Sequence, residues 1–211
     1  MYYAISIAAV ILAVLYFVYR DEIESFVTKK DVCNDLDGRC YPVSEKFSET
    51  DKASKLLAEL NIFCLNVMKH LRNKYLWTYN SNTEAKNIVK FLMSNYNPDG
   101  IIENVPTSDV NTSYVDDKGK EFGICLREKQ SGQNQFHNMH DLQFVVLHEM
   151  AHMANVRFGH EEDFWEIFKF LLTEAKEAGL HEPFDYSKVP MNYCSLVVSH
   201  NPYFDENTRV I

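Results

Sequence analysis

Three features that often reveal a protein's function are missing from this sequence. None of its five cysteines forms a Cys-x-x-Cys pair, so a thiolate zinc site is not indicated. No run of basic residues is present and the net charge is −9, which makes nucleic-acid binding a poor candidate. There is also no internal repeat and no low-complexity segment. The 211 residues, 46% of them hydrophobic, are instead expected to form one folded domain with a real core.

The cysteines leave two readings open. Cys33 and Cys40 could close a small disulfide loop, or they could both be free thiols. Because the total is odd, at least one cysteine is free or pairs between chains.

An uncharged apolar run occupies residues 2–19, with tyrosines at both ends. Since ~20 such residues cross a bilayer as a helix, we expect a transmembrane anchor and therefore a single-pass membrane protein. A cleaved signal peptide fits less well, because no basic segment precedes the run, and a buried core helix is a third reading. The expected organisation is an anchor over 1–20, a juxtamembrane linker over 21–31 and a folded domain over 32–211. Arg20, Lys29 and Lys30 favour a cytosolic position for that domain.

Hydrophobic periodicity in the remaining sequence predicts an α+β fold. Apolar residues recur at steps of three and four in the helices that we expect, which are 50–76, 83–96, 142–154 and 161–178. Short alternating segments bounded by turn residues predict strands at 41–43, 101–105, 112–115, 121–127 and 193–198.

The central motif is His148-Glu149-Met150-Ala151-His152, which lies in an apolar helical segment. Residues four apart share one face of a helix, so His148 and His152 can bind the same metal ion. Glu149 is placed beside them as a general base, which is the zincin arrangement. The alternative is an ordinary amphipathic helix with two hydrogen-bonded histidines.

Catalytic zinc usually has three protein ligands and one open position. His160 is the preferred third ligand, because it follows Gly159, where the chain can turn back after the helix. Glu162 or Glu166 from the next helix is the alternative. Two histidines of the polar loop before the motif are expected to be exposed: His137 and His140.

The spacing differs from the metzincin pattern, because Asn155 holds the position of its glycine and His160 follows eight residues after His152. The segment Gly159-His160-Glu161-Glu162-Asp163-Phe164-Trp165 instead resembles the Gly-His-x-x-x-Phe ending of WLM and SprT-like metallopeptidases. Further segments resemble WLM-like proteins of large DNA viruses and algae: Asp37-Gly38-Arg39, Tyr41-x-Val43, Ile124-Cys125-Leu126-Arg127, Leu142-Gln143-Phe144 and Pro190-Met191-Asn192-Tyr193-Cys194. The resemblance covers residues 32–202, although the connection from Met153 to Gly159 is longer than in typical WLM sequences.

The resemblance implies a zincin-like domain, with helices packed on a small, mostly antiparallel sheet. It also implies a virus-encoded zinc metallopeptidase that acts on polypeptides. Water activated by Zn²⁺ would attack a peptide carbonyl while Glu149 takes its proton, and Tyr193 is a candidate to hydrogen-bond the transition state. The acidic domain has no basic tail, so the family's DNA-repair role is not carried over.

The apolar run at residues 2–19 adds the bilayer as a partner. We therefore expect a virion or internal viral membrane location, with assembly onto other membrane or capsid proteins. The rival hypothesis is a non-enzymatic, membrane-anchored virion or scaffold protein that keeps the metallopeptidase fold.

Overall fold

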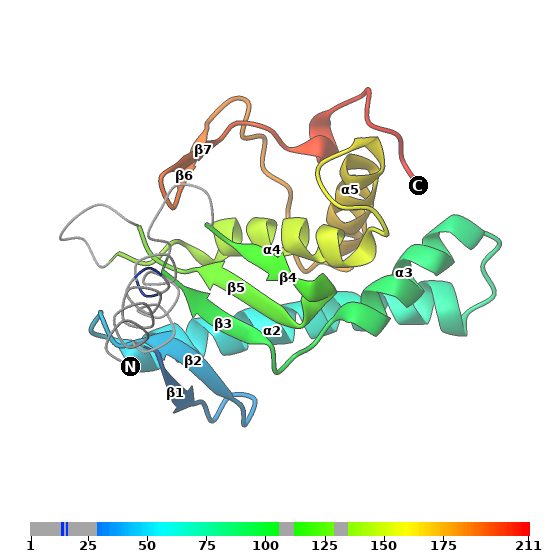
Figure 1. The fold of residues 1–211 in the computed structure, drawn as a ribbon. Helices are drawn as coiled ribbons and strands as arrows, with labels where there is room; N and C mark the ends of the chain where they lie inside the picture. Colours follow the sequence, from blue (N-terminus) through cyan, green and yellow to red (C-terminus); the bar gives the residue numbers. More distant parts are fainter. Residues whose placement is uncertain (1–13, 15, 17–28, 106–111, 129–134) are drawn as a thin grey trace, which may run out of the picture.

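The computed structural model describes Val14, Tyr16 and residues 29–105, 112–128 and 135–211. In this part of the chain, helices pack around small sheets, which confirms the α+β class (Figure 1). The main helices are α2 (Thr50–Arg72), α3 (Thr83–Asn95), α4 (Met139–Ala154) and α5 (Glu162–Glu177). Short helical turns are the π-helical η1 (Asn73–Trp77), which extends α2, and the 3-10 turns η2 (Asp117–Gly119) and η3 (Pro202–Phe204).

The strands form three small sheets among the described residues, where the sequence suggested one. The first pairs β1 (Lys29–Cys33) with β2 (Cys40–Ser44), and the last pairs β6 (Met191–Tyr193) with β7 (Leu196–Val198). In the middle sheet, β5 (Glu121–Cys125) lies between the parallel β3 (Ile101–Asn104) and the antiparallel β4 (Tyr114–Asp116). The two outer hairpins are attached to this sheet by side chains and not by backbone ladders, so they count as separate sheets.

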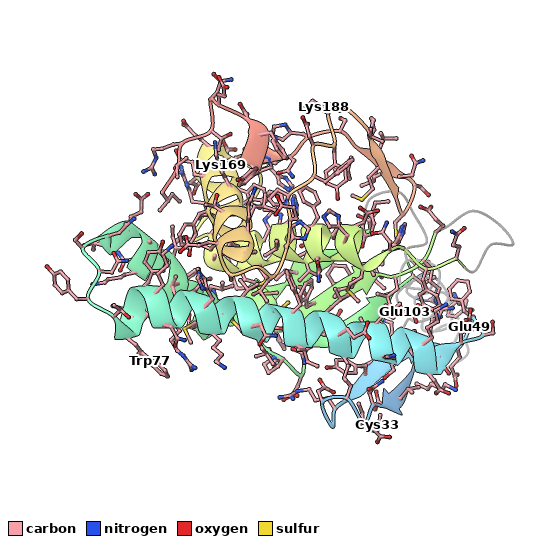
Figure 2. The ribbon with its side chains drawn as sticks, turned by 180° about the vertical axis from the view of Figure 1, so that it is seen from behind. Cys33, Glu49, Trp77, Glu103, Lys169 and Lys188 are labelled. Atoms are coloured by element: carbon pink, nitrogen blue, oxygen red, sulfur yellow. A yellow bond between two sulfur atoms is a disulfide. The ribbon has the colours of Figure 1, made fainter. Side chains whose placement is uncertain are left out.

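Side chains provide both attachments. The buried Glu103 of β3 accepts a hydrogen bond from the Ser44 backbone at 2.8 Å and pairs with the Arg127 guanidinium at 2.8 Å. On β5, next to the partner of Glu103, the Cys125 carbonyl accepts a hydrogen bond from the Tyr193 hydroxyl of β6 at 2.8 Å. Figure 2 places Glu103 near the N-terminal end of α2, and Cys33 on the hairpin that lies against the same end.

Helix α4 is the centre of the core. Ten of its sixteen residues are buried, and it contacts α2, α3, α5 and β4. The helix begins where the Asn138 side chain accepts a hydrogen bond from the Asp141 backbone at 2.9 Å. It ends at Ala154, as the sequence predicts. Since this helix is surrounded on most sides, the residues of its one open face are the ones that face a cavity.

Most predicted elements are confirmed to within a few residues, including the hairpin of β4 and β5. Two differ. The segment 193–198 was expected to add one strand, but residues 191–198 form the β6–β7 hairpin, because Cys194 and Ser195 turn the chain with φ values of +48° and +73°. In addition, β1 begins at Lys29, so the end of the expected linker 21–31 is part of a strand.

The predictions of a transmembrane helix and a single-pass membrane location are wrong, because no helix within the described residues is both long and apolar enough to cross a membrane. Helix α2 has the length, at 23 residues, but it carries charges such as Asp51, Lys55 and Arg72, whereas α3, α4 and α5 have at most 16 residues. The run over 2–19, apart from Val14 and Tyr16, lies outside the described residues.

Two disulfides are present, and Cys64 is a buried free thiol. Cys33–Cys40 closes the β1–β2 hairpin, as one reading of the sequence had it. Cys125–Cys194 joins the end of β5 to the β6–β7 hairpin across 69 residues of sequence. This second bond therefore fixes a hairpin that has few other covalent or backbone constraints.

We expect the two disulfides to stabilise the fold unequally. Replacing Cys125 and Cys194 together by alanine should lower the free energy of unfolding by about 4 kcal/mol, because the bond closes a long loop in the unfolded chain. Replacing Cys33 and Cys40 should cost about 2.5 kcal/mol, since that loop is short. Urea unfolding of both double variants without reductant measures the difference. Equal losses would contradict the expected dependence on loop length.

Candidate metal centre

Helix α4 presents His148 and His152 on its open face. The two rings lie one helical turn apart, with centroids 5.0 Å from each other. The four-residue spacing therefore places both imidazoles over the same cavity, as the motif predicts.

The loop after α4 brings His160 to the same point. The chain leaves the helix at Asn155, and Gly159 adopts φ +89°, a conformation that glycine accepts without strain. The Nε2 atom of His160 then lies 3.1 Å from Nε2 of His148 and 3.2 Å from Nε2 of His152. Two nitrogen ligands of a tetrahedral ion, at bonds of ~2.0–2.1 Å, are ~3.3 Å apart. The donor set and its spacing therefore fit one shared metal ion.

The three imidazoles are in the form that binds metals. Burial, together with the neighbouring His152 and His160, lowers the pKa of His148 to about 3. Burial, then His160 and Lys118, lowers the pKa of His152 to about 4, and burial also lowers the pKa of His160. All three rings are therefore neutral near pH 7, which is the protonation state of a metal ligand.

Phe164 of α5 packs against all three histidines. Its ring centroid lies 4.9 Å from that of His148, 4.3 Å from that of His152 and 4.6 Å from that of His160, and its side chain is fully buried. Phe168, one turn further along α5, lies 5.2 Å from His148. These apolar contacts, together with Trp165 beside His160, restrict the orientation of the imidazoles.

Two contacts that the sequence analysis missed hold the loop in place. The Lys118 ammonium, from the turn between β4 and β5, donates to the carbonyls of Asn155 at 2.8 Å and Arg157 at 3.3 Å. The indole N–H of Trp165 donates to the carbonyl of His160 at 3.1 Å. Since Lys118 is far from the loop in sequence, no local pattern could have identified it.

Glu149 lies next to His148 and is 6% exposed. Burial raises the pKa of its carboxyl to about 8. It lines a cavity of about 430 Å³ together with His148, His152 and His160. The three nitrogens and the carboxyl group thus face a common space large enough for water and a substrate group.

The alternative ligands lie elsewhere. Glu166 pairs with the Arg209 guanidinium through contacts of 2.8 and 2.7 Å, and Glu162 is exposed at the start of α5. Neither carboxylate belongs to the three-histidine cluster. The geometry therefore favours His160 as the third ligand.

Tyr193 is close to the site, but its hydroxyl is engaged. Besides donating to the Cys125 carbonyl, the hydroxyl lies 2.6 Å from Ser113 Oγ, and Ser113 Oγ accepts from the Cys125 backbone at 3.0 Å. Burial raises the pKa of the phenol well above its usual value. In this arrangement Tyr193 anchors the β6–β7 hairpin, and its transition-state role stays a prediction.

His137 and His140 are only partly exposed, whereas the sequence predicted exposed loop histidines. The His137 ring lies 4.7 Å from that of Tyr193, and its Nε2 lies 3.3 Å from Cys194 Sγ. His140, in the first turn of α4, stacks on His181 at 4.5 Å. His137 forms a second cluster with the two sulfurs of Cys125–Cys194, but sulfurs joined in a disulfide are not thiolate ligands.

Fold and site together define an α+β protein with three histidines and one glutamate converging on the open face of a central helix. Among known proteins, the chain is similar to the uncharacterized protein R325 of Acanthamoeba polyphaga mimivirus, with 28% identity over 93% of this chain and 94% of that protein. It is also similar to the uncharacterized protein 136R of Invertebrate iridescent virus 6, at 31% identity over 49% of this chain and 56% of that protein. The uncharacterized protein 042R of Invertebrate iridescent virus 3 is similar as well, at 33% identity over 46% of this chain and 57% of that protein.

No family model matches the chain, and no solved structure matches it. The resemblance to WLM and SprT-like metallopeptidases therefore stays a prediction from the quoted motifs.

We expect Phe164→Leu to weaken metal binding, because the smaller side chain frees the three imidazoles that Phe164 contacts. Zinc affinity should fall about tenfold, as for other residues that orient metal ligands. Phe170→Leu is the matched control, since Phe170 is equally buried in α5 but packs against Tyr75. Both changes should lower the free energy of unfolding by about 1 kcal/mol. Competition with a chromogenic chelator measures the affinity, and equal zinc affinities in the two variants would rule out the orienting role.

Proposed function

We propose that this chain is a zinc-dependent metallopeptidase that hydrolyses peptide bonds in polypeptides. The observation that carries the proposal is the convergence of three histidine nitrogens. Nε2 of His160 lies 3.1 Å from Nε2 of His148 and 3.2 Å from Nε2 of His152, and all three line an open cavity with the buried Glu149. The motif resemblance to WLM and SprT-like enzymes supports the same function.

The residues fit zinc best. Neutral imidazoles also suit copper, iron and nickel, but three histidines with a fourth position left to water are typical of catalytic zinc. His148, His152 and His160 would hold the ion. When bound, zinc supplies a Lewis acid that activates water and polarises a carbonyl group.

The protein's own groups perform the proton transfers. Glu149 lines the same cavity as the three ligands. A bound cation would lower its raised pKa, and the ionised carboxylate would then be placed to accept a proton from the attacking water and to deliver it to the leaving amine. The rings of Phe164 and Trp165 exclude water from one side of the ligands. Trp165 also fixes the backbone of His160, which keeps the third ligand in position.

The rival hypothesis is a non-enzymatic scaffold that retains the fold. A structural zinc site is closed by four protein ligands, whereas a catalytic site keeps one position accessible. Among the described residues, the cluster offers three histidines and opens on a cavity of about 430 Å³. That accessible volume favours the enzyme, since a scaffold needs neither the cavity nor Glu149.

We expect Glu149→Gln in the full chain to lower kcat/KM for peptide cleavage by about 10²- to 10⁴-fold, because the amide cannot accept the proton. Zinc binding should remain at one ion per chain. Glu162→Gln is the control: it removes an exposed carboxylate next to the site and should change neither quantity. A proteome-derived peptide mixture, analysed by mass spectrometry, reports cleavage. If wild type and Glu149→Gln cleave equally, the proposed function is wrong.

The role of the third ligand can be tested separately. His160→Ala should weaken zinc binding and abolish cleavage, and a chelator should abolish cleavage by the wild type until zinc is restored. Metal analysis of the purified full chain measures the first effect. Stoichiometric zinc in His160→Ala with unchanged affinity would instead indicate a ligand set without His160.

A further inference from the structure

A second cavity of about 290 Å³ opens beside the candidate metal centre. It shares Thr112, Ser113, His148, Glu149 and Leu196 with the larger cavity, so the two spaces adjoin along a boundary that includes Glu149. Its other walls come from α4, α5 and the β6–β7 hairpin. The lining is mainly apolar and includes Phe144, Val145, Trp165, Phe168, Leu196, Val197 and Val198, while Thr112, Ser113, Tyr193, Ser199 and His200 add polar groups.

The hairpin wall is held rigidly. In the β6–β7 ladder, Leu196 lies opposite Tyr193, and Val198 lies opposite Met191. Residues that lie opposite each other point to the same face of the hairpin, so Leu196 and Val198 are on the face of the buried Tyr193 and Met191. Cys194, between the strands, is bonded to the end of β5 by the disulfide. The wall that faces Glu149 is therefore apolar and tied at its turn.

The two cavities differ in chemistry. Among the described residues that line the smaller one, Glu149 is the sole acid, and none is a lysine or an arginine. The larger cavity, in contrast, includes Lys118 and Arg157. An apolar cavity of about 150 Å³ can bind benzene, so about 290 Å³ has room for a phenyl, indole or leucyl side chain. An unpaired charge in the same space would lose its hydration without compensation.

We propose that the smaller cavity is the specificity pocket, and that it takes a large apolar side chain, aromatic or leucine, from the substrate residue next to the scissile bond. This inference rests on the proposed peptidase function. Because Glu149 lies where the two cavities meet, a peptide whose carbonyl is attacked there places one flanking side chain in the apolar space. The other flank of the peptide then runs through the larger cavity, which carries Lys118 and Arg157.

A binding measurement tests the pocket without requiring cleavage. The chain has two tryptophans, and Trp77 is 70% exposed at the end of η1, far along the extended α2 from Glu49 (Figure 2). In the full chain with Trp77→Phe and Glu149→Gln, Trp165 is the remaining tryptophan and lines the cavity. Titration with acetyl-Ala-Phe-Ala-amide should give a saturable change in Trp165 fluorescence. The same peptide with Glu in place of Phe should bind at least tenfold more weakly, and equal affinities would overturn the proposal.

Cleavage kinetics test the role in catalysis. The peptides carry Phe, Leu, Ala or Glu at each position flanking the scissile bond. At one of the two positions that flank the scissile bond, wild-type kcat/KM should be at least tenfold higher for Phe and Leu than for Ala. Val198→Phe fills the cavity, so it should lower kcat/KM for the Phe and Leu peptides and remove most of this preference. Val189→Phe is the matched control, because Val189 is 60% exposed and lies outside the cavity.

A second variant tests the same preference if Val198→Phe does not fold. Leu196 is 43% exposed, so Leu196→Asp can be introduced at the cavity mouth without burying a charge in the core, and it should reduce the same preference. Glu149-dependent cleavage with no side-chain preference would overturn the specificity pocket and leave the proposed function intact. If no peptide is cleaved in a Glu149-dependent manner, the proposed function fails, and the substrate role of the cavity fails with it.

Discussion

The contact among three imidazole nitrogens is the constraint on which the rest of this structure depends. A neutral imidazole nitrogen carries either one proton or one lone pair, so the Nε2 atom of His160 can make one good hydrogen bond, to His148 or to His152. At least one of the two short contacts is therefore left without a proper donor–acceptor pair. A cation at the centre removes this conflict, because all three lone pairs then point at it. This argument favours a metal ion independently of any motif.

The surrounding elements can be understood as the means of enforcing that contact. Helix α4 fixes two nitrogens one turn apart, the Gly159 turn returns the chain, and α5 places Phe164 behind all three rings. Glu149 destabilises the folded chain at the same place, because its carboxyl group is buried without a cation and burial raises its pKa to about 8. Stability alone would not favour a glutamate there. A cluster of buried polar groups that does not favour stability usually marks a functional site.

Local sequence patterns predicted the parts of the site that depend on local geometry. The spacing of His148 and His152 fixes a helix face, and the break after Ala154 with Gly159 fixes where His160 can return. The Lys118 contact and the Cys125–Cys194 bond escaped prediction, because each depends on which distant segments meet. The β6–β7 hairpin was missed for a local reason: its turn residues, Cys194 and Ser195, adopt positive φ values without the glycine or asparagine that usually signals such a turn. The apolar composition of residues 2–19 predicted a membrane helix, which is wrong because no helix of the described residues is both long and apolar enough to cross a membrane. Apart from Val14 and Tyr16, that run lies outside the described residues.

The long-range bond has a consequence for the site as a whole. Cys125 ends β5, the strand that pairs with the β4 edge, and Cys194 sits in the turn of the hairpin that walls the smaller cavity. Leu196 lines both cavities and Tyr193 hydrogen-bonds to β5, so the hairpin cannot shift without changing both spaces. The position of the apolar wall relative to Glu149 is thus set by a covalent bond outside the metal centre. A site built in this way separates two tasks: α4, the Gly159 turn and α5 fix the ligands, while the disulfide fixes the shape of the space in front of them.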